Sequence, residues 1–214
     1  MTGDDEKFLR FYRQHHPFLR SFLLVSQGGS VDAAISIGRL FRKYLIEAFG
    51  PIKSSPSGMA HARPWLDSTG RMVDWCQDRE CVCASACALV WFGAVERDGV
   101  VGLHRPFTED PAFKALTPAE ASTVYRSILN RVTRYLDDME VPKSMIDMMV
   151  NTGSSEIRWV DGASDGMKRP PSIAEWEDAS RGSFTDEERR ALNDLLVKNE
   201  PVITGTTFVQ SIVG

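Results

Sequence analysis

The segment from residue 21 to about residue 48 constrains the fold most, because it joins a short apolar run, two glycines and a helical pattern. Residues 21–26 (SFLLVS) form the apolar run, which is typical of a buried strand. Gly28 and Gly29 then interrupt it, and Ser30 is a suitable N-cap for the helix predicted by the apolar residues that follow at three- and four-residue spacing. The segment therefore predicts a strand, a Gly-Gly turn and a helix, which is a building unit of α/β folds.

Similar patterns predict further elements along the chain. The segment Thr117-Pro118-Ala119-Glu120 is a capping box with proline at the first helical position, and it opens a helix that reaches about residue 139. The predicted inward stripe of this helix consists of Ala121, Val124, Ile128, Val132, Tyr135 and Leu136. The other predicted elements are helices over 5–15, 83–93 and 142–153, and short strands over 100–103 and 157–160.

Residues 50–80 interrupt this order. Glycine, proline and serine cluster in the segment GPIKSSPSG, and no periodicity remains. We predict a long surface loop over 50–80, with one short helix near residues 72–75.

The polar remainder of the chain sets the predicted domain boundary. Two small helices are predicted near 172–180 and 185–198. The 214 residues suit one well-buried domain with appendages rather than two full enzymes. We expect a domain over residues 1–162 and a small helical C-terminal extension over residues 163–214.

Charge and hydropathy exclude several classes of partner. Lysine and arginine number 25 against 29 aspartates and glutamates, so the net charge is −4. Such a chain has no global attraction to nucleic acid or anionic lipid, and no apolar run approaches the ~18 residues of a membrane span. The charged N-terminus lacks the apolar core of a signal peptide. The chain as it stands is predicted to be cytoplasmic, or periplasmic if an upstream signal has been lost.

Three short segments contain candidate functional residues. In SQGGS, Gly28 and Gly29 lie between a strand and a helix, where backbone N–H groups can face an anion, although a structural turn explains them equally well. In CASAC, Ser85 lies between alanines at a loop-to-helix junction, which is typical of a nucleophile elbow with the Ala86 N–H beside it, or of a helix cap. In GLHRP, His104 comes where a strand ends, and a structural role is the alternative.

The order Gly-Gly, Ser, His resembles the Clp protease proteolytic subunit superfamily, within the Clp/crotonase fold. The matching segments are LLVSQGGSVDAAISIGRLFR, CVCASACALVWFGAVER, VVGLHRPF and YLDDMEVPKSMIDMMVNTGSSEIRWV. The closer resemblance is to a bacterial group of Clp-like, often periplasmic, predicted serine proteases. It implies an α/β domain of repeated β-α units, a peptide or protein substrate, assembly into an oligomer, and no cofactor or metal.

The resemblance also implies a role for each site residue. Ser85 corresponds to the nucleophile and His104 to the general base, while Gly28, Gly29 and the N–H of Ala86 correspond to the oxyanion loop. The family places an aspartate before its last strand as the third triad member. This chain has no aspartate in register there, and the candidates are Glu156, Asp147 and Asp161. The family's first strand would precede residue 1.

Two other functions use the same residues. The first is a catalytically degenerate Clp-like module that binds a peptide or protein partner. The second is acyl-CoA chemistry of the crotonase kind, in which the same oxyanion arrangement acts on a thioester but an exposed serine beside a histidine has no role.

Four cysteines lie within twelve residues, at positions 76, 81, 83 and 87. Their spacing fits zinc sites poorly. Cys83 and Cys87 flank Ser85, and we expect them to be buried and unpaired with each other. A strand residue and a residue of the first helical turn seldom have Cα atoms within the ~4.4–6.8 Å that a disulfide needs. Cys76 and Cys81 are the pair more prone to oxidise, and four free thiols are equally compatible with the sequence. A Cys83–Cys87 bridge would count against the elbow assignment.

Overall fold

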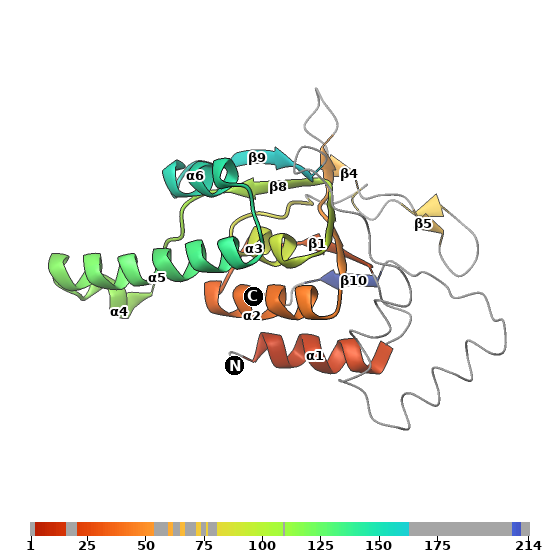
Figure 1. Cartoon of the computed structure of the whole chain (residues 1–214), viewed down its shortest axis with the longest axis horizontal. Helices are drawn as coiled ribbons and strands as arrows, with labels where there is room; N and C mark the ends of the chain where they lie inside the picture. The colour runs from red at the N-terminus through yellow and green to blue at the C-terminus, as the bar shows by residue number, and fades with distance from the viewer. Residues whose placement is uncertain are drawn as a thin grey trace.

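The computed structural model describes residues 3–15, 21–53, 60–61, 65–66, 72–73, 76, 81–108, 110–162 and 207–210. Helices and strands are drawn in Figure 1. The helices are α1 (Asp4–His15), α2 (Val31–Lys43), α3 (Ala86–Gly93), α4 (Pro111–Lys114), α5 (Pro118–Asp138) and α6 (Lys143–Asn151). The strands are β1 (Ser21–Val25), β2 (Glu47–Phe49), β3 (Ile52–Lys53), β4 (Ala60–His61), β5 (Trp65–Leu66), β6 (Met72–Val73), β7 (Glu96–Asp98), β8 (Val100–Leu103), β9 (Arg158–Asp161) and β10 (Thr207–Gln210).

A parallel sheet forms the centre of the molecule. Strands β1, β2 and β7 pair in that order, with Phe22 opposite Ala48 and Ala48 opposite Arg97. Helix α2 lies between β1 and β2 in the sequence, and α3 precedes β7, so strands alternate with helices. Strand β10 pairs in parallel with the other edge of β1. The α/β class predicted from the sequence is therefore confirmed.

A second, antiparallel ladder continues the structure beyond β1. Strands β8 and β9 pair with Gly102 opposite Trp159. The segment before α3 connects this ladder to the parallel sheet through two parallel bridges, Ser26 with Cys83 and Ala84 with Gly102. The carboxyl end of β1, the start of α3 and the carboxyl end of β8 therefore lie beside one another.

An aromatic cluster fixes the two N-terminal helices against the sheet. The Phe8 ring lies 5.2 Å from that of Phe41 and 5.6 Å from that of Phe22, and the Tyr12 ring stacks on that of Tyr44 at 4.9 Å. All five side chains are buried. Burying each of them stabilises the fold by about 1.5–3 kcal/mol, so this packing explains why the amphipathic pattern of residues 5–15 forms a helix here.

Helices α2 and α3 cross at two glycines. A Cβ added to Gly93 would collide with the backbone of Gly38, and a Cβ added to Gly38 would collide with the hydroxyl of Tyr135. That hydroxyl donates a hydrogen bond of 2.7 Å to the Leu89 carbonyl in α3. Three helices thus meet where only glycine leaves room for the backbones to approach.

Several sequence-based boundaries need correction. The first long helix ends at Lys43 rather than near residue 48, because Leu45 has a positive φ of 51° and the chain then enters β2. Strands β2 and β7 have no counterpart among the elements predicted from the sequence. The segment predicted as a loop contains the two-residue ladders β3–β4 and β5–β6, and Met72–Val73 is the strand β6 rather than a helix.

After residue 162 the structure describes only strand β10. The two small helices expected near 172–180 and 185–198 lie outside the described residues. Residues Thr207–Gln210 form a strand of the parallel sheet.

Helix α5 starts as the sequence predicts, but only its C-terminal half packs against the rest of the protein. Thr117 and Glu120 form the capping box. Of the predicted inward stripe, the structure buries Val132, Tyr135 and Leu136, whereas Val124 is 40% exposed. The N-terminal half of α5 extends away from the sheet (Figure 1).

Candidate functional site

Ser85 lies at a strained turn between Cys83–Ala84, whose backbones bridge to Ser26 and Gly102, and the start of α3. We call this turn the elbow. Its φ of 59° and ψ of −125° are unusual for a residue with a side chain. Its amide donates to the Gly102 carbonyl at 3.0 Å, which fixes the elbow against β8. The Ser85 side chain makes no capping hydrogen bond, so the alternative of a simple helix cap is wrong. Strain of this kind costs about 1–3 kcal/mol and is concentrated at functional sites.

The Gly-Gly turn lies directly against this elbow. Gly28 has φ of 126° and Gly29 has φ of 139°, both in the region that favours glycine. A Cβ added to Gly28 would lie 2.7 Å from the Cβ of Ser85 and 3.0 Å from its Oγ. The structure therefore brings together two motifs that lie more than fifty residues apart in the chain.

The backbone amides around Ser85 differ in their hydrogen bonds. The Gly28 N–H donates to the Ser26 hydroxyl at 3.2 Å. Within the described part of the chain, the amides of Gly29 and Ala86 donate no hydrogen bond. Ala86 is the first residue of α3, where an amide has no partner inside the helix. These two N–H groups are therefore free to donate to another group.

The side chain of Ser30 explains why α2 starts beside this turn. Ser30 accepts a hydrogen bond from the Ala33 amide at 3.3 Å and so caps the helix as predicted. The cap fixes where the Gly-Gly turn ends.

His104 directly follows β8, whose Gly102 pairs with Ala84. Its backbone therefore reaches the same edge as Ser85. The His104 side chain is buried, with 8% of its surface exposed. Its Nδ1 lies 2.9 Å from the Arg105 carbonyl oxygen, and its ring lies 5.6 Å from that of Phe107. In the described structure the Ser85 hydroxyl and Nε2 of His104 make no hydrogen bond with each other, so the contact of ~3 Å that general-base catalysis needs stays a prediction for the substrate-bound state.

The three candidate third members occupy different places. Asp147 is exposed on α6 and forms an ion pair of 2.7 Å with Lys143. Asp161 lies opposite Val100, at the far end of β8 from His104. Glu156 is exposed in the turn before β9, where its amide donates to the Gly153 carbonyl.

Both cysteine pairs form disulfides, Cys76–Cys81 and Cys83–Cys87. The first pair is the one that the sequence marks as more prone to oxidise, but the expectation that Cys83 and Cys87 are unpaired is wrong. The two residues are buried as predicted, and their Cα atoms lie 5.3 Å apart. The reason is the backbone of Ser85, whose positive φ reverses the chain so that the first turn of α3 returns toward Cys83. The bridge and the elbow therefore coexist.

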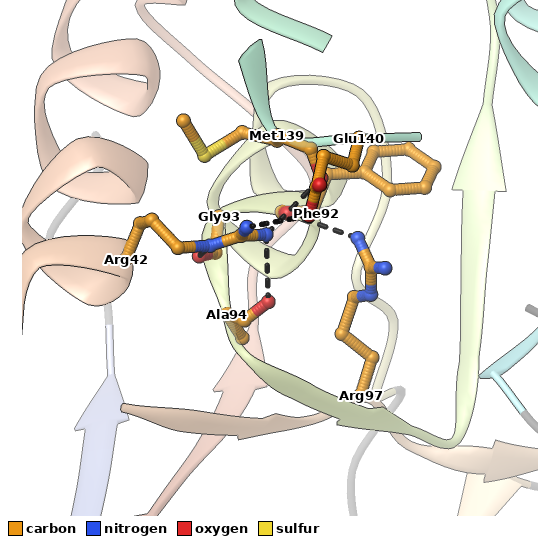
Figure 2. A network of polar contacts seen from close by, with 7 residues as sticks. All are labelled: Arg42, Phe92, Gly93, Ala94, Arg97, Met139 and Glu140. Atoms are coloured by element: carbon orange, nitrogen blue, oxygen red, sulfur yellow. Dashed lines mark hydrogen bonds and ion pairs between the residues drawn. The ribbon is translucent and has the colours of Figure 1, made fainter. Parts of the chain in front are cut away.

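Two arginines that no sequence motif indicates fix the opposite end of α3 (Figure 2). Arg42 donates to the carbonyls of Gly93 at 3.1 Å, Ala94 at 3.4 Å and Met139 at 3.1 Å. Arg97 donates to the Phe92 carbonyl at 3.0 Å. Cations at a helix C-terminus stabilise its dipole and satisfy its last carbonyls.

An exposed apolar pair also lies beside the elbow. Ile157 is 46% exposed and Trp159 is 39% exposed. A Cβ added to Gly102 would meet the side chains of Ile157, Trp159 and Ala84. Because Gly102 has no side chain, this pair lies next to the segment that carries Ser85. The spacing in the sequence does not indicate this proximity.

Comparison with protein-family models, curated proteins and solved structures found no match. In the described residues, no group of three or more histidine, cysteine or acidic side chains has a geometry that could hold a metal ion. None of the described helices combines the length and the apolar composition needed to cross a membrane.

Proposed function

We propose that this protein is a serine-type peptidase of the Clp proteolytic subunit kind, with Ser85 as nucleophile and His104 as general base. The observation that carries the proposal is the strained backbone of Ser85, at φ 59°, combined with a hydroxyl that does not cap its helix. The elbow allows the Cys83–Cys87 bridge, but the bridge gives the free Ser85 hydroxyl no structural role. The elbow suits a hydroxyl that must stand clear of the backbone to reach a substrate.

The reaction follows from these groups. The Ser85 oxygen attacks the peptide carbonyl carbon while its proton passes to Nε2 of His104. The C–N bond then breaks, the same proton goes to the leaving amine, and an ester to Ser85 remains. Water hydrolyses this ester with His104 again as the base.

Two backbone amides are suited to the charge that develops. The N–H groups of Gly29 and Ala86 would donate to the oxyanion of the tetrahedral intermediate. Loss of one such donor typically costs about 3–4 kcal/mol of transition-state stabilisation.

The decisive test is covalent labelling of the purified protein by a fluorophosphonate probe. The wild type is expected to gain one adduct, mapped by mass spectrometry to Ser85, and Ser85→Ala is expected to gain none. Ser155→Ala is the matched control, because Ser155 is an exposed turn residue. A wild type that stays unlabelled while folded would contradict the proposal.

The exposed apolar pair favours a second candidate function. Ile157 and Trp159 beside Gly102 offer a surface for an apolar peptide segment, with or without catalysis. A catalytically degenerate module that binds a peptide or protein partner would retain peptide binding and leave Ser85 unlabelled. The crotonase alternative is not proposed, since it gives the elbow serine no role.

Two disulfides within a few residues support an oxidising compartment for the folded protein, because disulfides seldom persist in a reducing cytosol. This favours the periplasmic alternative. Assembly into an oligomer stays a prediction that rests on the resemblance.

A further inference from the structure

We infer that the backbone carbonyl of Arg105, rather than a carboxylate, orients His104 as the base. This inference rests on the proposed function for its catalytic meaning, but its structural content concerns only the His104 ring. The ring contacts Phe107 on one side and places Nδ1 2.9 Å from the Arg105 carbonyl oxygen.

The chemistry of that contact fixes where the ring proton lies. A carbonyl oxygen can only accept a hydrogen bond, so the nitrogen facing it must carry the hydrogen. The neutral His104 ring is therefore protonated on Nδ1, and its Nε2 keeps a lone pair. This is the tautomer that a general base needs, because Nε2 must accept the serine proton.

The residue that supplies this carbonyl is anchored through its backbone amide. The Arg105 amide donates to the Thr152 carbonyl at 3.0 Å, directly after α6. Thr152 is buried, and its hydroxyl donates to the Met148 carbonyl at 2.7 Å. The peptide that joins His104 to Arg105 is thus fixed by the end of a neighbouring helix. The Arg105 carbonyl belongs to the next peptide unit, and its contact with Nδ1 gives it the positioning role that an aspartate has in a triad.

The positions of the three carboxylates agree with this role. Asp161 lies opposite Val100, four residues before His104, which corresponds to about 13 Å along an extended strand. Asp147 already pairs with Lys143 on the exposed face of α6. Of the three carboxylates, Glu156 is the closest to His104 in the strand register. It lies in the turn two residues before Arg158, and Arg158 pairs with Leu103, the residue before His104. Glu156 would have to compete for a proton that the Arg105 carbonyl already accepts.

The first test is spectroscopic and does not require activity. Histidine labelled with ¹⁵N gives different shifts for a protonated and an unprotonated ring nitrogen, and His104→Gln identifies the signals of this residue among the four histidines. The neutral ring is expected to carry its proton on Nδ1 in the wild type and in Glu156→Gln. A proton on Nε2 would overturn the inference.

The second test measures the rate of fluorophosphonate labelling in Glu156→Gln, Asp147→Asn and Asp161→Asn. We expect each variant to react within about threefold of the wild-type rate. Replacing the carboxylate of a true triad lowers the rate by on the order of 10⁴-fold, so a loss above about 100-fold in any variant with a wild-type thermal midpoint would overturn the inference. If the wild type is never labelled, the proposed peptidase function is refuted. The position of the proton on the His104 ring, measured by the first test, would then decide this inference alone.

Discussion

Gly28 and Ser85 lie so close together that a Cβ on Gly28 would stand 2.7 Å from the Ser85 Cβ and 3.0 Å from its Oγ. Each residue also has a positive φ, of 126° and 59° respectively. The two backbones therefore pack so closely that a side chain on Gly28 would enter the space of the serine side chain.

Gly28→Ala is expected to reduce labelling of Ser85 more than it reduces stability. The new methyl group would enter the space of the Ser85 hydroxyl and would need a φ that alanine rarely adopts. We expect a loss of about 1–2 kcal/mol in the free energy of unfolding and a loss of at least about tenfold in the labelling rate. Urea unfolding and probe kinetics on the same preparation measure both.

Gly153→Ala is the matched control for that experiment. A Cβ at Gly153 meets no atom within 4 Å, so both stability and labelling should stay near wild type. If Gly28→Ala lost labelling only in proportion to its unfolded fraction, the glycine would be a structural turn.

Removal of the Cys83–Cys87 disulfide should affect the site beyond its effect on stability. In the chain-entropy view, a bridge that closes so short a loop stabilises the fold by about 2 kcal/mol. We expect the double variant C83S/C87S to lose about that amount. We also expect it to label several times more slowly, because the bridge spans the strained Ser85 turn.

The second disulfide provides the comparison. Cys76–Cys81 closes a loop of nearly the same length, and its Cα atoms lie 5.6 Å apart. The variant C76S/C81S should lose a similar free energy of unfolding and keep its labelling rate. Equal rates for the two double variants would mean that the bridge around Ser85 serves stability alone.

Arg42→Met should destabilise the protein strongly, because it removes the donor to two carbonyls at the end of α3 and to the Met139 carbonyl at the end of α5 (Figure 2). The long apolar side chain keeps much of the arginine's packing, so the loss reports mainly on hydrogen bonds to a charged group. We expect about 2–4 kcal/mol from thermal or urea unfolding.

Arg39→Met is the control on the same helix. Arg39 pairs at 3.3 Å with Asp138, and both side chains are more than half exposed. Such surface pairs contribute about 0–1 kcal/mol. Similar losses for the two variants would show that the carbonyl contacts of Arg42 have no special weight.

Stability should fall at alkaline pH because of Tyr135. Burial raises the pKa of this phenol far above its ordinary value near 10, against a smaller lowering by Arg42, Arg39 and Arg97. A pKa raised in the folded state means that the unfolded chain loses its proton first. The stabilisation is therefore complete below about pH 10 and declines above it.

Tyr135→Phe tests this assignment. It should cost about 1 kcal/mol at neutral pH through loss of the hydrogen bond to the Leu89 carbonyl, and it should flatten the decline above pH 10. Denaturant midpoints measured between pH 7 and pH 11 would show both effects. An unchanged alkaline slope in the variant would assign the decline to other groups.

The sequence determined those features of the fold that depend on local chemistry. Ser30 and the Thr117–Glu120 box cap their helices as predicted, since a capping hydrogen bond involves residues only a few positions apart. The apolar run of β1 and the turn at Gly28 and Gly29 were also predictable, because strand patterning and positive φ leave a mark in composition. Ser85 and His104 could be singled out for the same reason, since each lies at a junction between elements.

Only the tertiary structure decided which distant groups meet. The Cys83–Cys87 bridge depends on the φ of Ser85, and no spacing rule contains a backbone torsion. The contacts of Arg42 with the end of α3 join residues about fifty positions apart. The accepting carbonyl beside His104 carries no sequence signal at all, because every residue has one. Local patterns thus predicted the elements and the candidate residues, whereas long-range packing determined their partners.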